Sequence, residues 1–155
     1  MHSTQKLETV MKQKLIIFFT AVLTTAILIP LRGGYLNIST LSSFQMADIG
    51  YLIVFFPLTL FILNRYSRQI KLSEILALLL IGSSWDLVTS ITHMPGSLVS
   101  MLDFLCRWAA IIAAFLFYKS SYRKRLLVLG SFIIIGLAIV IVQEPYFWFI
   151  VNNVD

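Results

Sequence analysis

The chain alternates long apolar segments with short polar connections, and this pattern predicts a series of membrane-spanning helices. Each segment approaches the length of about 20 residues that a helix needs to cross the hydrocarbon core of a bilayer. The predicted helices cover residues 15–30, 49–63, 72–92, 97–118 and 126–142. We therefore expect an all-α integral membrane protein, built as a single bundle of about five transmembrane helices.

The segments outside the helices are too short to fold alone, so residues 15–155 are expected to form one bundle, preceded by a polar cytoplasmic tail at residues 1–14. The composition agrees, because 59% of the 155 residues are hydrophobic and 12% are charged. A soluble domain has about 25% charged residues. The first apolar run is long, and no small-x-small cleavage site follows it, which favours a retained helix over a cleaved signal peptide.

The end of the chain has a different composition from the helices before it. Gln143, Glu144 and Pro145 are expected to break the fifth helix. The aromatic segment that follows, Tyr146 to Val151, is typical of an anchor at the membrane interface. We expect this tail to lie in the interface rather than to continue the helix.

Basic residues are distributed unequally between the two sides of the predicted bundle. Ten of the twelve Lys and Arg residues lie in the tail and in two connections that face the same side, whereas Arg32 is the single basic residue in the other connections. The basic residues of the two connections are Arg65, Arg68, Lys71, Lys119, Arg123, Lys124 and Arg125. The positive-inside rule then predicts a cytoplasmic amino terminus, an outer carboxyl terminus and a multi-pass protein of the bacterial inner (cytoplasmic) membrane.

Away from their cytoplasmic ends, the third and fourth predicted helices contain three charged residues, at positions where charge is costly and usually faces protein or water. They are Asp86, Asp103 and Arg107. Asp103 and Arg107 are four residues apart and share a helical face, and Asp86 has a similar depth. Ser83 and Ser84 are additional candidates for polar or partner contacts. These groups either form contacts with one another that stabilise the fold, or they bind a ligand or transfer protons. The sequence leaves both interpretations open.

Residues 71–119 are therefore expected to form a core hairpin of the third and fourth helices. Small residues in both helices, Gly82 to Ser84 in one and alanines in the other, would allow these two helices to pack closely.

The sequence contains few residues that could bind a metal, form a disulfide or catalyse a reaction. One cysteine and two histidines give no metal cluster, no disulfide and no nucleophile in a recognisable catalytic setting. We expect neither enzymatic activity nor a cofactor. The basic residues lie at helix ends, so they indicate topology and contact with membrane lipid rather than nucleic-acid binding.

The central segment resembles the family of the rod shape-determining protein MreD. The resemblance lies in the order of the helices and in a pattern formed by Gly82, Asp86, Leu87, Ser90 and Gly96. It implies a non-catalytic scaffold subunit of the cell-wall elongation machinery, which would bind MreC-like and wall-synthesis proteins and help to set cell shape during peptidoglycan synthesis.

Two other classes of protein also use short helical bundles. One is a self-protection protein, such as a membrane immunity protein or a protein that excludes incoming conjugative elements. The other is a substrate-binding membrane component of a transporter, although this function usually needs a larger polar cavity.

Overall fold

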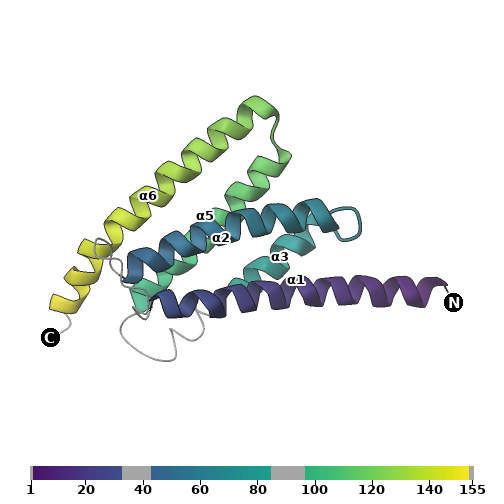
Figure 1. Ribbon diagram of the computed structural model, residues 1–155, viewed down its shortest axis with the longest axis horizontal. Coiled ribbons are helices and arrows are strands. Elements are labelled where there is room, and N and C mark those ends of the chain that lie inside the picture. Colours follow the sequence, from purple (N-terminus) through teal and green to yellow (C-terminus); the bar gives the residue numbers. More distant parts are fainter. Residues whose placement is uncertain (1, 33–42, 85–96, 154–155) are drawn as a thin grey trace.

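The computed structural model describes residues 2–32, 43–84 and 97–153, most of which are helical (Figure 1). In chain order the helices are α1 (His2–Arg32), α2 (Ser43–Tyr66), α3 (Leu72–Ser83), α5 (Ser97–Lys119) and α6 (Tyr122–Asn153). No strand occurs in these ranges, which confirms the predicted all-α class for the part of the chain described. Within it, α1, α2 and α6 are long and apolar enough to cross a membrane.

The first helix begins earlier than predicted. Residues 1–14 were expected to form a separate tail, but α1 starts at His2 and continues without interruption past Leu15. An ion pair of 2.6 Å between Glu8 and Lys12, four residues apart, supports the helix in this polar stretch. With 31 residues α1 is about 46 Å long, more than the ~30 Å of a hydrocarbon core.

Two other boundaries also differ from the prediction. The second helix begins at Ser43, six residues before the predicted start, and so includes Asp48. The helix α6, which corresponds to the fifth predicted helix, does not break at Pro145, because its backbone stays helical to Asn153. The predicted third helix is described only to its Ser83 end, and its remaining residues lie outside the described ranges.

The helix α2 is the centre of the packing, because it contacts each of the other four helices. In Figure 1, α1 and α6 lie on opposite sides of α2 and α5. The buried residues of α2 recur at helical spacing along one face. They include Asp48, Tyr51, Leu52, Phe55, Thr59, Ile62 and Leu63.

The described part of the expected core hairpin, α3 and α5, is in contact, but this contact is not the main packing of either helix. Instead, α5 packs mainly on α2, and α3 packs mainly on α1. Aromatic contacts help to join α2 to its neighbours: the ring of Phe56 stacks on Phe132 of α6 with centroids 4.9 Å apart, and meets Phe117 of α5 edge-on at 5.8 Å. Tertiary packing therefore groups helices that are not consecutive in sequence.

The contact between α1 and α3 is close because Gly82 has no side chain. A Cβ atom at Gly82 would lie 2.7 Å from the Cβ of Ala21 and 3.0 Å from the carbonyl oxygen of Phe18. The expected close packing of small residues is therefore present, but at Gly82 the partner is α1 instead of the fourth predicted helix.

We predict that Gly82→Ala destabilises the protein by about 1–3 kcal/mol, because a new methyl group would force α1 and α3 apart. The matched control is Gly130→Ala, since a Cβ at Gly130 meets nothing within 4 Å. Alanine favours a helix by up to about 1 kcal/mol relative to glycine, so the control should be neutral or stabilising. Unfolding by denaturing detergent in micelles measures both variants, and an equal response would contradict the close contact.

Candidate functional site

Three charged side chains are completely buried between α2 and α5. Asp48 lies on α2, Asp103 and Arg107 lie one turn apart on α5, and each has 0% of its surface exposed. Arg107 is the largest fully buried side chain, and it is the one buried cation among the described residues. Burial of charge is unfavourable unless the charged groups are compensated, so the contacts around these residues determine whether the packing is stable.

Arg107 connects three helices. Its Nη1 donates a hydrogen bond to the carbonyl oxygen of Ser83 in α3, at 2.5 Å. Its guanidinium carbon lies 4.1 Å from the centroid of the Tyr51 ring in α2. A guanidinium over an aromatic face is stabilised by about 2 kcal/mol or more when both groups are shielded from water. Arg107 therefore holds α5 against both α2 and α3.

The two carboxylates lie near the same point of the bundle. Cys106, next to Arg107 on α5, is close enough to Asp48, Asp103 and Arg107 for its side chain to interact electrostatically with all three. Neither carboxylate is isolated, because both take part in further polar or electrostatic contacts. We define Asp48, Tyr51, Asp103, Cys106 and Arg107 as the buried polar cluster.

The buried polar cluster is enclosed by the core. Its charged members have no exposed surface, and buried apolar residues such as Phe55 and Ala110 follow them along α2 and α5. This arrangement can fix the position and rotation of the helices, because misplacing one helix would leave a charge uncompensated. It presents no charged group to a molecule outside the bundle.

Of the residues predicted for an intramembrane polar site, Asp103 and Arg107 are both buried one turn apart on α5. Ser83 contacts Arg107 through its backbone carbonyl oxygen, whereas its hydroxyl group donates to the carbonyl oxygen of Leu80 at 3.0 Å. Ser84 donates its hydroxyl proton to the carbonyl oxygen of Leu80, 2.6 Å away in the same helix, so this bond stays within α3. Asp86 lies outside the described residues.

Asp48 and Tyr51 were not identified from the sequence. Asp48 directly precedes the apolar run that starts at Ile49, so it was assigned to a connection. The available signal was its spacing, since Asp48, Tyr51 and Phe55 recur every three or four residues on one helical face.

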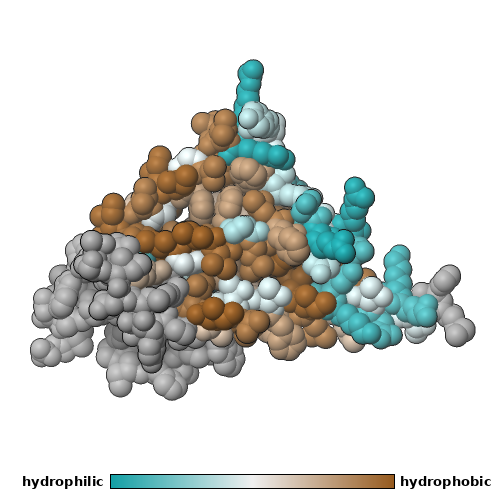
Figure 2. Space-filling view, in the orientation of Figure 1, coloured by the Kyte–Doolittle hydropathy of each residue, from teal (hydrophilic) through white to brown (hydrophobic). Residues whose placement is uncertain are grey.

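The basic residues predicted to set the topology lie at the ends of the helices. Figure 2 shows hydrophilic residues along one edge of the visible face, from the α5–α6 turn to the amino-terminal part of α1, whereas hydrophobic residues cover most of the remaining coloured surface. An ion pair of 3.3 Å joins Lys14 of α1 to Glu74 of α3, and Gln13 of α1 hydrogen-bonds to Gln69. These contacts place the polar half of α1 beside the α2–α3 turn.

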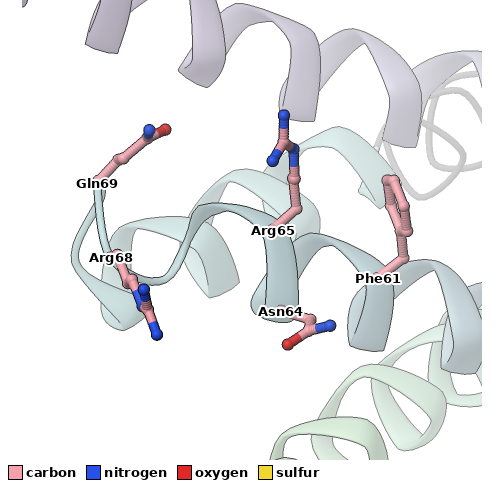
Figure 3. Close-up of a pocket in the computed structure, with 5 residues that line it drawn as sticks. All are labelled: Phe61, Asn64, Arg65, Arg68 and Gln69. Atoms are coloured by element: carbon pink, nitrogen blue, oxygen red, sulfur yellow. The ribbon is translucent and has the colours of Figure 1, made fainter.

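A pocket of about 400 Å³ lies at the α2–α3 turn (Figure 3). It is lined by Phe61, Asn64, Arg65, Arg68 and Gln69. In Figure 3 the side chains of Arg65 and Arg68 extend in different directions from the turn, so they do not converge on one point. The pocket is therefore polar and cationic, but it is not organised around a single anion.

Among the described residues, no group of three or more His, Cys, Asp or Glu side chains is placed to hold a metal ion. Comparison of the chain with models of known protein families, with curated proteins and with solved structures found no match.

We predict that Arg107→Met destabilises the protein by about 3–5 kcal/mol, because it leaves buried carboxylates without the guanidinium and removes the bond to Ser83. Arg65→Met is the matched control, since Arg65 is exposed and the same change should cost less than about 0.5 kcal/mol. The yield of folded protein and its thermal stability in detergent measure the difference. Equal stability of the two variants would show that Arg107 does not hold α5 against α2 and α3.

Proposed function

We propose that this chain is a non-catalytic, multi-pass subunit of the bacterial inner membrane that acts by binding other membrane proteins. The observation that supports the proposal is that the buried charged side chains are kept away from the outer surface of the bundle. The charged groups of the buried polar cluster are enclosed, whereas the outer faces of the helices are strongly apolar. Contacts with partners inside the membrane would then use helix surfaces instead of an open polar site.

The helix α6 is the best candidate for such contacts. Of the three helices that could cross a membrane, it has the smallest buried share. Its exposed apolar residues include Ile133, Ile134, Ile135, Leu137 and Ile141. This face can be covered either by lipid or by helices of a partner.

The proposed orientation has the amino terminus in the cytoplasm and the carboxyl terminus outside. It is supported by the basic residues at the α2–α3 and α5–α6 turns and by the contact between Lys14 and Glu74, which brings the basic part of α1 to the same side. Basic segments close to helix ends remain on the cytoplasmic side.

The orientation can be measured with single cysteines. The one natural cysteine, Cys106, is buried, so it should react little with a membrane-impermeant thiol reagent in folded protein. We expect Gln5→Cys, Arg68→Cys and Tyr122→Cys to react in inverted membrane vesicles and to be protected in intact cells. Reaction of any of the three from the outside would contradict the proposed orientation.

The resemblance to the rod shape-determining MreD family suggests a specific role, namely a scaffold that binds MreC-like and wall-synthesis proteins during elongation. Of the residues that carry this resemblance, Gly82 lies in the described part of the chain, where it allows α1 and α3 to approach closely.

Depletion of the protein in its native cell should cause loss of rod shape if this role is correct. A photo-crosslinking amino acid in place of Ile134, which is 69% exposed, should capture wall-synthesis partners, whereas the same group in place of the buried Ala110 should not. Unchanged cell shape together with no captured wall-synthesis protein would contradict the scaffold role. The alternatives to test next would be immunity, exclusion of conjugative elements, and transport.

A further inference from the structure

An apolar groove of about 330 Å³ runs between α5 and α6 on the outside of the bundle. The residues that form its walls are mainly aliphatic and small. They include Ala109, Ala113 and Leu116 of α5 and Val128, Ser131 and Ile135 of α6. Within a membrane such a groove does not stay empty, because its walls would lose van der Waals contacts.

The groove leads to a positive charge at its end near the α5–α6 turn. On α6, Lys124 precedes Val128, Ser131 and Ile135 by four, seven and eleven residues, so it lies on the same helical face as the groove. On α5, Lys119 follows Leu116 by three residues and stands at the edge of the groove. Arg125 turns toward α5, where its guanidinium carbon lies 5.4 Å from the centroid of the Phe117 ring. Arg123 is about 100° around the helix from Lys124, so Lys124 is the basic residue of α6 that is best aligned with the groove.

The groove and the two lysine residues beyond its end together span half of a bilayer. From Ala109 to Lys119 the rise along α5 is about 15 Å, and from Lys124 to Ile135 along α6 it is about 16 Å. One leaflet contributes about half of the ~30 Å hydrocarbon core. The groove and these lysines together therefore extend from the level of the phospholipid head groups to the region near the bilayer centre.

We propose that this groove binds an anionic phospholipid from the leaflet next to the α5–α6 turn. One acyl chain lies between α5 and α6, and the phosphate contacts Lys124, with Lys119 beside it. A phospholipid supplies both the apolar chain and the negative charge in one molecule. A helix of a partner in the same position would have to supply a separate acidic residue opposite Lys124.

This site differs from the pocket at the α2–α3 turn, where the two arginines extend in different directions (Figure 3). The proposal is also independent of the partner and orientation proposed above, because it concerns whichever leaflet adjoins the α5–α6 turn.

Native mass spectrometry of the purified full-length protein tests the head-group contact, with phosphatidylglycerol and phosphatidylcholine of identical acyl chains as probes. We expect preferential binding of phosphatidylglycerol, and a loss of about fivefold in its affinity in Lys124→Gln, from the contribution of one basic residue to binding of anionic lipid. Arg123→Gln removes the same charge from another face of α6 and should leave the affinity unchanged. Equal effects of the two variants would overturn the proposal, since they would indicate general charge attraction.

A second variant tests the groove itself. Ser131→Trp fills the groove while keeping Lys124, and should reduce binding of both lipids, whereas Ile134→Trp on the exposed face should not. Soluble glycerol phosphate should not displace phosphatidylglycerol, because it lacks the acyl chain. Three results would each overturn the proposal. The first is lipid binding that Ser131→Trp does not change, and the second is displacement of the lipid by glycerol phosphate. The third is capture of a protein helix instead of lipid by a photo-crosslinker at position 113.

Discussion

The packing of α2 against α5 depends on how three charged side chains are accommodated away from water. Asp48 and Arg107 come from different helices, and Asp103 lies one turn from Arg107. Moving an ion from water to a low-dielectric interior costs several kcal/mol even after relaxation, so each charge restricts where its neighbours can lie. The hydrogen bond to Ser83 and the face of Tyr51 add directional constraints that apolar packing alone lacks. The buried polar cluster thus links the positions of α2, α3 and α5.

Other contacts extend this arrangement toward both ends of the bundle. Near one end of α2, the side-chain amide of Gln45 donates to the carbonyl oxygen of Val140 in α6 at 3.3 Å. Near the other end, the hydroxyl groups of Ser67 and Tyr118 lie 3.1 Å apart and join α2 to α5. Between these points, apolar side chains and the close approach at Gly82 fill the space between helices. The charged groups of the buried polar cluster lie inside the bundle, and the outer surface of the helices is largely apolar.

The sequence predicted the helical class and the position of Asp103 and Arg107 on one helical face, because both depend on local periodicity. It did not predict which helices pack together, since an apolar stripe identifies the buried face but not its partner. Asp48 was assigned to a connection because hydropathy decreases at a charged residue, and its burial results from tertiary contacts. The polar start of α1 was taken as a tail for the same reason, although the ion pair between Glu8 and Lys12 and the contact of Lys14 with Glu74 support a helix there.

The central claim is that Tyr51 on α2 and Arg107 on α5, whose guanidinium carbon lies 4.1 Å from the centroid of the Tyr51 ring, depend on each other energetically. A double-mutant cycle with Tyr51→Leu and Arg107→Gln measures this directly from unfolding free energies in detergent micelles. The account predicts that the double variant is less destabilised than the sum of the single variants, with a coupling energy of about 0.5–3 kcal/mol. Additivity within about 0.3–0.5 kcal/mol would contradict it, because the two residues would then be buried independently of each other.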